Sequence, residues 1–459
     1  MPLKHDEVKL YSELFRSLEE REPILSAWRY HCDSPKLSLK KKIVTTLADL
    51  KKKGASYLST LQSPKSGQVV VLLLRDSPAT SGMLLPIMRS LCQIQAPAFL
   101  IVNGNTKHYL QQGLHSGYAT VNQLLCSVLK STEVKRIENK AEEYQKELMK
   151  VSNSKRFENA ADWIAMGLKA KEVSRIYFGA LNFILTDTDL GAFDKGILLG
   201  TSKQSCSAIL QHGFFDEKNF PIHSKKHIDW GPYFTKQAEL YGHPANRSVS
   251  LGSPRFDRLE AIKQYPRNAE VLSKFDMLKK PVVMAISNTH AYGIFREHLD
   301  SYVESIEELL DSDITVLVRL HPAETGTSFY HDHLGAEKCR KIIFISAKED
   351  MYEIMNKCDV VYHTLSSAAM EGMLLGKPVL WEEAPEKRAY MEPPLLGGGI
   401  FVNSGNIVDA VKSVGPEGAE RKKVLDSQEE FLSISVVNRG HAADAIADYM
   451  LEKTSKEDP

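Results

Sequence analysis

The chain has 459 residues, about three times the usual domain length of roughly 150, which predicts two packed domains with additional segments. Hydrophobic residues make up 43% and charged residues 25%, a composition that excludes disordered, collagen-like and disulfide-stapled classes. Lys plus Arg equals Asp plus Glu at 58 each. Because the formal net charge is then zero, no overall electrostatic attraction favours the binding of a polyanion. No nucleic-acid partner is therefore expected.

Targeting and redox signals are absent from the sequence pattern. The longest apolar runs, such as residues 69–74, are far shorter than the roughly 18 to 20 residues of a membrane helix, and the N-terminal MPLKHDEVKL has no apolar signal core. The six cysteines form no CxxC pair and no zinc-like spacing, so they are interpreted as reduced and structural. We therefore expect a cytoplasmic protein.

Residues 1–62 are predicted to form a helical appendage. They are rich in Lys, Glu and Leu, and Leu10, Leu14 and Leu18 recur at helical spacing. Two LKKK sequences, at 39–42 and 50–53, could line a basic stripe that contacts an acidic partner or the inner face of a membrane. The alternative is an ordinary solvated helix face.

Residues 63–262 are predicted to form a first Rossmann-like domain. The run VVVLLL, an apolar helix and the run AFLIVNG read as a βαβ unit. Continuous rather than alternating hydrophobicity indicates strands that are buried on both faces, as in a parallel sheet covered by helices. A charged helical stretch at about 132–177 follows, and then the apolar segments NFILTD, GILLG and SAILQHG.

The same pattern begins again after a Lys-rich passage, so residues 263–432 are predicted to form a second Rossmann-like domain. Short apolar strands (KPVVMAISN, TVLVRLHP, KIIFIS, CDVVYHT and KPVLW) alternate there with helices, the first at about 294–310. Residues 433–459 are predicted to form a C-terminal helix, from about Ser433 to Leu451, and a charged tail. The fold class is therefore α/β, with two Rossmann-like domains that face a cleft where ligands of such folds bind.

The most informative segment is 359–380, DVVYHTLSSAAMEGMLLGKPVL. A buried strand leads to a turn with Ser366 and Ser367, and the serines then precede a short helix. Free N–H groups and hydroxyls at a helix start favour a phosphate or pyrophosphate. Glu371, in the same helix, is placed to hold a ribose or sugar hydroxyl. The alternative is that Ser366 only caps the helix.

Two histidines follow predicted strands at the edge where α/β proteins bind ligands. His321, followed by Pro322, comes after the strand TVLV, and its imidazole could donate to a phosphate or a leaving-group oxygen. His212 closes the strand SAIL of the first domain, next to Gly213. We therefore expect His212 and His321 to face one cleft from opposite sides.

Other polar segments have weaker signals. Asp189, like Asp187, follows a strand and could be a general base or cap a turn. Ser287 and Asn288 open a strand–helix loop that resembles a phosphate cradle without GxGxxG glycines. GSPRFDRL, residues 252–259, is interpreted as only shaping the linker.

Several familiar site motifs are missing from the sequence. It contains no P-loop, no GxSxG elbow and no metal-ligand spacing. No dinucleotide cofactor and no metal are expected.

The order of the motifs resembles GT-B fold glycosyltransferases of bacterial surface polysaccharides: the capsule polysaccharide synthesis family, CDP-glycerol glycerophosphotransferases and polysialyltransferases. The similarity covers roughly residues 180–400, in the segments LQHG, WGPYF, LYGHP, GSPRFDRL, LHPAE and HTLSSAAMEGMLLGKPV.

The resemblance implies a metal-independent transfer in which the second domain holds a nucleotide-activated donor and the first an acceptor. His321, Ser366 and Ser367 would bind the donor phosphate. The base would be His212, by likeness to the glycerophosphotransferases, or a carboxylate such as Asp189, by likeness to the polysialyltransferases.

The function that the resemblance implies is transfer of a sugar from a nucleotide-sugar, for example a CMP-linked acidic sugar. The acceptor would be a surface glycan, a lipid-linked glycan or a protein. The alternatives are an isomerase or hydrolase like UDP-N-acetylglucosamine 2-epimerase, which shares the fold, and a non-catalytic scaffold of polysaccharide assembly.

Overall fold

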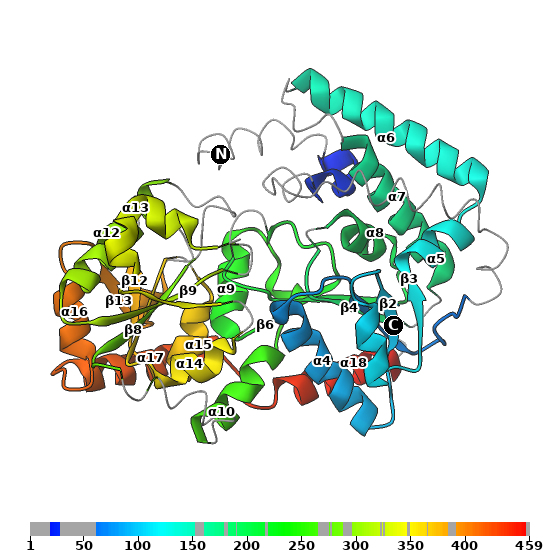
Figure 1. The fold of residues 1–459 in the computed structure, drawn as a ribbon. Helices are drawn as coiled ribbons and strands as arrows, with labels where there is room; N and C mark the ends of the chain where they lie inside the picture. The colour runs from blue at the N-terminus through cyan, green and yellow to red at the C-terminus, as the bar shows by residue number, and fades with distance from the viewer. Residues whose placement is uncertain are drawn as a thin grey trace.

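The computed structural model describes most of the chain (Figure 1). The described residues are 19–27, 61–151, 160–178, 182–189, 191–215, 219–264, 275, 278–287, 296–321, 324, 326–346, 349–364, 366–383 and 392–455. Most of the predicted appendage, including both LKKK sequences, lies outside them, as do Pro322 and Asn288.

The first domain is built on a seven-stranded, fully parallel sheet with the strand order β3-β2-β1-β4-β5-β6-β7. Its strands are β1 (Val69–Leu73), β2 (Phe99–Val102), β3 (Gly117–Thr120), β4 (Phe183–Thr186), β5 (Cys206–Leu210), β6 (Lys226–Asp229) and β7 (Ser248–Ser250). The expected continuous burial is confirmed in β1, where all five residues are buried. Val70 and Leu72 pack into one core cluster while Val69, Val71 and Leu73 pack into another, so both faces of the sheet are covered.

Helices cover both faces of this sheet. They are α4 (Pro78–Gln93), α5 (Val121–Ser127), α6 (Ser131–Val151), α7 (Ala160–Tyr177), α8 (Ala192–Gly200), α9 (Pro232–Leu240) and α10 (Asp257–Gln264), with short 3₁₀ helices η3 (Lys107–Gln112), η6 (Ala245–Arg247) and η7 (Pro254–Phe256). The apolar segment GILLG lies inside α8. There α8 packs closely on α7, because a Cβ at Gly196 would lie 2.2 Å from the carbonyl oxygen of Gly167.

The second domain has a six-stranded parallel sheet with the order β10-β9-β8-β11-β12-β13, the same relative order as in the first sheet. Its strands are β8 (Val282–Ile286), β9 (Thr315–Arg319), β10 (Ile343–Ile345), β11 (Val360–His363), β12 (Val379–Glu382) and β13 (Ile400–Val402). Its helices are α12 (Arg296–Asp311), α13 (Ser328–Cys339), α14 (Met351–Lys357), α15 (Ala368–Leu374), α16 (Ile407–Val414) and α17 (Arg421–Ser435), with the 3₁₀ helix η10 (Pro393–Leu396). The predicted α/β fold with two Rossmann-like sheets is confirmed.

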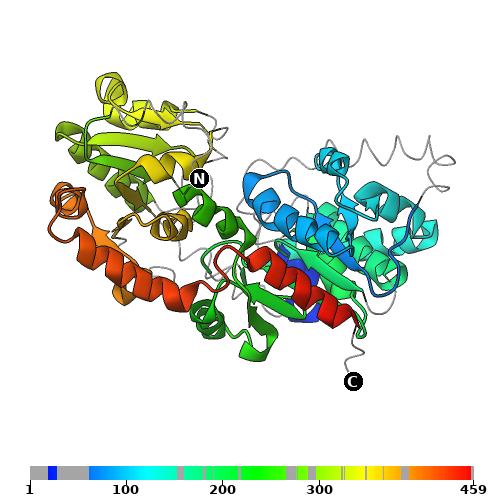
Figure 2. The ribbon, with the colours of Figure 1, turned by 90° about the horizontal axis from the view of Figure 1, so that it is seen from below.

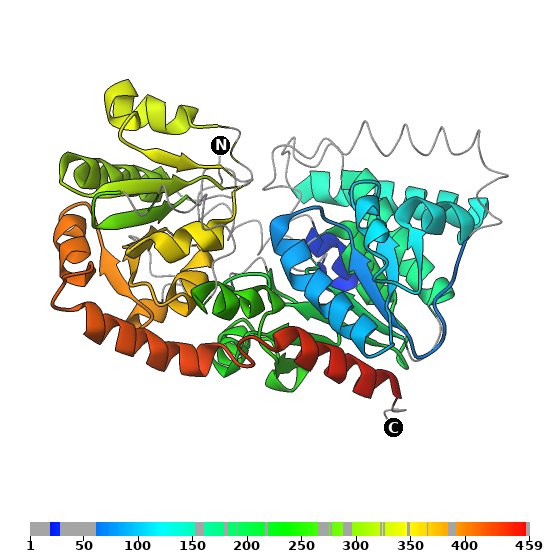
Figure 3. The same ribbon diagram turned by 60° about the horizontal axis from the view of Figure 1, so that its bottom comes forward.

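The chain returns to the first domain at its C-terminal end. Helix α17 runs along the second domain, and α18 (Ala442–Ser455) then packs on α4 of the first domain (Figures 2 and 3). The single helix expected at about 433–451 is therefore wrong: Val436 is extended, and Asn438 and Gly440 have positive φ angles of 50° and 80°. This break lets one end of the chain contribute to both domains.

The described part of the N-terminal segment packs into the first domain. In η1 (Pro23–Ala27), Ile24 and Leu25 are fully buried in the cluster that contains α7 and α8. Glu22 forms ion pairs with Lys140 of α6, at 3.3 Å, and Lys171 of α7, at 3.0 Å. Residues 19–27 are thus part of the packed body of that domain.

One core cluster continues from one sheet to the other. It includes Val70 and Ile184 of the first sheet and Met284 and Val361 of the second. Phe214, which follows β5, has its ring centroid 5.6 Å from that of Trp381 in β12. Among the residues described, no helix is both long enough and apolar enough to span a bilayer.

Candidate active site between the two sheets

The register of the second sheet brings the predicted donor-binding residues to one edge. Ile286 of β8 is paired with both Arg319 of β9 and His363 of β11. Because all three strands are parallel, the residues that follow them emerge side by side. Ser287, His321 and the turn of Ser366 and Ser367 therefore share the carboxyl edge of this sheet.

His363 orients the turn that carries the two serines. Its Nδ1 accepts a hydrogen bond of 3.1 Å from the backbone N–H of Ser366, and its ring centroid lies 4.3 Å from that of Trp381. Burial lowers the pKa of His363 to about 3, so the ring is neutral and carries its proton on Nε2. The sequence analysis included His363 in a motif but gave it no role.

The two serines have different surroundings. The hydroxyl of Ser366 accepts a hydrogen bond of 3.3 Å from the backbone N–H of Ala368. Ser366 therefore makes a contact of the capping kind, which was the alternative interpretation of this residue. Ser367 stands at the N-cap position of α15, yet its side chain makes no capping bond. Its hydroxyl instead accepts a long hydrogen bond of 3.5 Å from Nη2 of Arg255, in the first domain. Ser367 is thus the serine that faces the opposite sheet.

Glu371 lies at the centre of an ion pair between the domains. Its Oε1 is 2.9 Å from Nε of Arg255, and both side chains are almost fully buried. The same oxygen accepts a hydrogen bond of 3.3 Å from the hydroxyl of Tyr352. Burial raises the pKa of Glu371, while Arg255 acts in the opposite direction. The carboxylate predicted to hold a sugar hydroxyl is already engaged by protein groups.

Arg255 contacts several parts of the site at once. Besides Glu371 and Ser367, its Nη1 donates to the carbonyl oxygen of His212 at 3.2 Å. Its guanidinium carbon lies 5.2 Å from the ring centroids of Trp230 and Phe256, a distance at which cation–π attraction operates. Two aromatic faces and three polar partners fix this side chain.

The interpretation of residues 252–259 as only a linker shape is therefore wrong. Their contacts with both sheets arise from tertiary packing. The signal in the sequence was the first of two arginines in a turn-like stretch, directly after β7 at a carboxyl edge.

His212 follows β5 and belongs to the carboxyl edge of the first sheet. The residue is exposed to solvent, while enough protein atoms lie near its imidazole to desolvate it. Burial lowers the pKa of His212 to about 4; Asp187 opposes this effect, whereas Arg255 and Arg75 add to it. At neutral pH the imidazole is uncharged, the form that can accept a proton.

A buried charge cluster lies near His212. Nη1 of Arg75 contacts Oδ1 of Asp187 at 3.0 Å, and Nη2 contacts Oδ2 of Asp194 at 2.5 Å. The Thr80 hydroxyl donates to Oδ2 of Asp187 at 2.6 Å. Asp187 is fully buried, and its carboxylate therefore supplies a fixed negative charge in the neighbourhood of His212.

Asp189 is placed differently from Asp187. It is 2% exposed, and its Oδ2 accepts the backbone N–H of His223 at 3.0 Å. Burial raises its pKa, and Lys195 opposes the shift. Of the two candidate bases, His212 is the accessible group and Asp189 is the buried one.

His321 and Ser287 lie together at the carboxyl edge of the second sheet. The backbone N–H of His321 donates to the carboxylate of Glu324, and the N–H of Ser287 donates to the carbonyl oxygen of Arg319 at 3.0 Å. Burial, with the nearby charge of Arg319, lowers the pKa of His321 to about 4. A neutral imidazole at this edge can donate one hydrogen bond to a phosphate oxygen.

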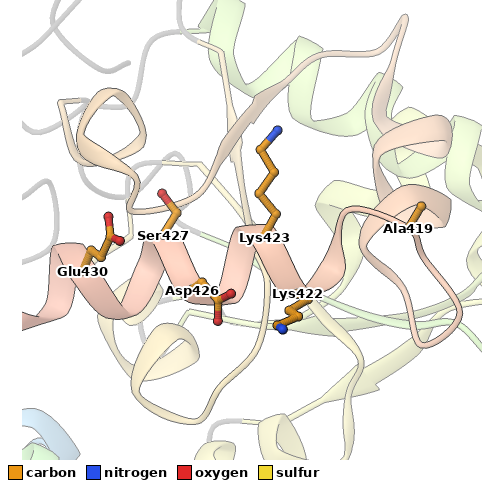
Figure 4. A pocket seen from close by; sticks show the side chains of 6 residues that line it. All are labelled: Ala419, Lys422, Lys423, Asp426, Ser427 and Glu430. Carbon is orange, nitrogen blue, oxygen red and sulfur yellow. The ribbon is translucent and has the colours of Figure 1, made fainter.

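Two further features of the described residues bear on the site. Within the part of the chain that the structure describes, no group of three His, Cys, Asp or Glu side chains could hold a metal ion. A separate hollow lies along α17, away from the residues above (Figure 4). Both positively and negatively charged side chains line this hollow. The lining residues are Ala419, Lys422, Lys423, Asp426, Ser427 and Glu430.

Residues 233–396 match the family described as CDP-glycerol:poly(glycerophosphate) glycerophosphotransferase. A glycosyltransferase from Rickettsia africae has a similar structure, with a TM-score of 0.52 and 14% sequence identity over 86% of this chain and 100% of that one.

UDP-GlcNAc 2-epimerase from Neisseria meningitidis, solved with UDP-GlcNAc, is similar with a TM-score of 0.51 and 12% identity over 84% of this chain and 99% of that one. The S. aureus protein MnaA, solved with UDP, has a TM-score of 0.52 and 13% identity over 85% and 98% of the two chains. No curated protein matches the sequence.

The resemblance predicted from the sequence is confirmed. The protein has a GT-B-like fold, and its residues 233–396 have the pattern of the CDP-glycerol glycerophosphotransferase family.

Proposed function

We propose that the protein moves a group from a cytidine-nucleotide donor to a hydroxyl acceptor at the junction of its two sheets. The observation that carries the proposal is the convergence of His212, Arg255, Ser367 and Glu371 from both domains. Arg255 contacts both the backbone of His212 and the hydroxyl of Ser367. A neutral imidazole, a guanidinium and a hydroxyl are suited to deprotonating an acceptor and stabilising a departing phosphate.

The proposed step balances as follows. The acceptor hydroxyl gives its proton to His212, and the acceptor oxygen forms a bond to the transferred group of the donor. The bond between that group and the bridging oxygen breaks, and its electron pair stays on the nucleotide phosphate. Ser366, Ser367 and His321 bind this phosphate by hydrogen bonds. Closure of the site against water favours transfer over hydrolysis.

Two classes of donor fit this chemistry. The family match supports CDP-glycerol, in which the acceptor oxygen attacks phosphorus and CMP leaves. The alternative is a nucleotide-sugar such as a CMP-linked acidic sugar, in which the acceptor oxygen attacks carbon. Both reactions leave the developing charge on a nucleotide phosphate, so the same residues serve either donor.

The acceptor we propose is a surface polymer in growth, either a glycan or a glycerophosphate chain, that is lipid-linked or protein-linked. A lipid-linked acceptor would place the reaction at a membrane surface. We therefore extend the proposal to a cytoplasmic enzyme that contacts the membrane at its periphery through the two LKKK sequences of its N-terminal segment.

The test is a release assay with purified protein and CDP-glycerol, a CMP-linked acidic sugar or UDP-GlcNAc, each with and without a polymer acceptor. We expect acceptor-dependent release of CMP from one cytidine donor. A thermal-shift series with CMP, CDP and UDP, in the wild type and in a Ser366→Ala, Ser367→Ala double variant, reports binding separately, because a ligand of the native state raises the Tm.

The same assay decides between the alternatives. Conversion of UDP-GlcNAc without any acceptor would replace the transferase by an epimerase. Absence of both nucleotide binding and turnover would favour a non-catalytic scaffold in polymer assembly.

A further inference from the structure

The ion pair between Arg255 and Glu371 has features that packing alone does not require. Arg255 comes from the first domain and Glu371 from the second, and the side chains are 8% and 3% exposed. Removing two charges from water costs several kcal/mol per ion, which a single contact rarely repays. The other nitrogens of the Arg255 guanidinium therefore need further partners to offset this cost.

The guanidinium is held in one orientation. Its Nε faces Oε1 of Glu371 at 2.9 Å, and the aromatic rings of Trp230 and Phe256 lie 5.2 Å from its central carbon. Oε2 of Glu371 is buried and has no hydrogen-bond partner among the described residues. Glu371 thus holds the guanidinium at Nε, and the edge formed by Nη1 and Nη2 is available for other partners.

That opposite edge lies between the two halves of the candidate site. Nη1 donates to the carbonyl oxygen of His212 at 3.2 Å, and Nη2 to the hydroxyl of Ser367 at 3.5 Å. A Cβ built on Gly213 would lie 3.7 Å from the same hydroxyl, so the two segments are in direct contact. Each Nη nitrogen carries two N–H groups, of which these contacts use one.

We propose that Arg255 is a catalytic residue whose Nη edge binds the phosphate that leaves with the nucleotide, and that Glu371 is the positioning residue that fixes this edge. The inference rests on the proposed transferase function. It gives Glu371 a role other than the sugar-hydroxyl contact expected from sequence, and it assigns Arg255 to the site.

Chemically, Arg255 acts on the electron pair that the broken bond leaves on the nucleotide phosphate. A planar guanidinium can donate two parallel N–H groups to two phosphate oxygens, which a lysine ammonium cannot do. Because Glu371 and the aromatic rings already fix the donors, little reorganisation is needed as the charge develops. Arg255 would hold this phosphate together with Ser367 while His212 takes the acceptor proton.

The test compares three variants of the full-length protein in the donor assay. Arg255→Lys keeps the charge but loses the fork, and we expect kcat to fall about 10²- to 10³-fold, as for loss of one preorganised donor. Glu371→Gln keeps the shape but loses the anchoring charge, and we expect a smaller fall, about tenfold, because the fork is still present. Arg439→Ala, which removes a pair with exposed Glu429, is the matched control and should not alter kcat.

Chemical rescue distinguishes catalysis from a structural role. In Arg255→Ala, added guanidinium chloride at concentrations below those that unfold the protein should raise kcat about tenfold or more, as a mobile ion replaces the missing donors. It should have no such effect on Glu371→Gln. The affinity for CMP, followed by thermal shift, should fall in Arg255→Lys while the Tm of the free protein stays near that of the wild type.

The inference fails if the wild type is active and Arg255→Lys keeps its kcat. It also fails if Arg255→Ala loses activity together with a large drop in Tm and is not rescued, which would make the pair structural. A wild type that neither binds nucleotides nor releases them would instead overturn the proposed function, and the inference with it.

Discussion

The two domains share one strand order but build their functional edges from different groups. At the edge of the first sheet, Arg75 pairs with the buried carboxylates Asp187 and Asp194, and these charges surround His212. At the edge of the second sheet, neutral groups predominate: Ser366 and Ser367 follow a strand that ends in the uncharged His363.

The difference suggests a division of labour. A fixed set of opposite charges can tune the proton affinity of one base, whereas hydroxyls and backbone groups suit a phosphate that brings its own charge. Arg255 connects the two edges because it contacts both His212 and Ser367. Substitutions at each edge, and at the connection between the domains, therefore have separable effects.

The largest effect is expected from the base of the first edge. His212→Gln removes the proton acceptor and should lower kcat by about 10²- to 10⁴-fold, the usual contribution of general base catalysis. The donor affinity, measured by thermal shift with CMP, should change little, because Gln at position 212 keeps the carbonyl oxygen that Arg255 contacts and leaves the proposed phosphate ligands in place. Asp189→Asn is the comparison variant: equal loss of kcat there, with His212→Gln active, would move the base to the carboxylate.

The next effect concerns the charge cluster that surrounds His212. Arg75→Met leaves Asp187 and Asp194 buried without their shared cation, and we expect the free energy of unfolding to fall by about 3 to 5 kcal/mol. Urea denaturation measures this loss. Arg439→Met, at a pair with an exposed glutamate, should change it by less than about 1 kcal/mol. Similar losses of unfolding free energy in both variants would mean that the buried cluster stabilises the fold no more than an exposed ion pair does.

Acid stability compares the two domains directly, because each contains a buried histidine whose pKa is lowered to about 3. Burial lowers the pKa of His227, next to β5 in the first sheet, and of His363, in the second, to about 3. The unfolded chain takes up these protons near pH 6.5. Stability should therefore be full above pH 6.5 and fall as the pH drops toward 3, by about 1.4 kcal/mol per pH unit for each histidine.

Single variants His227→Phe and His363→Phe should each reduce the slope of unfolding free energy against pH by that amount. If neither core variant changes the slope between pH 6 and 4, the two rings do not stay uncharged in the folded protein.

The smallest effect should come from the connection between α18 and the first domain. Both carboxylate oxygens of Asp257 accept backbone N–H groups at the start of α18, from Ala442 and Ala443, at 2.9 Å each. Asp257→Ala removes this cap and should lower the Tm by an amount equivalent to about 1 kcal/mol. The Tm of Asp257→Asn, which keeps one acceptor oxygen, should lie between the Tm of Asp257→Ala and that of the wild type. An unchanged Tm in Asp257→Ala would show that α18 is held by its apolar face alone.

Most of the fold could be predicted from local patterns. The continuous apolar runs that became β1, β8 and β11 were recognisable because a strand buried on both faces needs no polar alternation. Short strands were harder to recognise, and β3, β6 and β13 were not predicted. Their burial depends on neighbouring strands more than on their own residues.

Part of the site was also within reach of sequence reasoning. His212 and Ser367 each follow a buried strand, and parallel strands end at a common edge, so their approach could be expected once two sheets were assigned. The different contacts of Ser366 and Ser367 could not, because neighbouring residues in one turn have similar local signals.

The sequence by itself determined two parallel sheets, their covering helices and the strand ends at which polar side chains gather, since these follow from residue periodicity and from the geometry of parallel strands. Only the tertiary structure decided that Arg255 meets Glu371, that α18 returns to the first domain and that Asp189 is buried. These contacts join residues that are distant in sequence, and their existence depends on how whole domains pack, which no local pattern encodes.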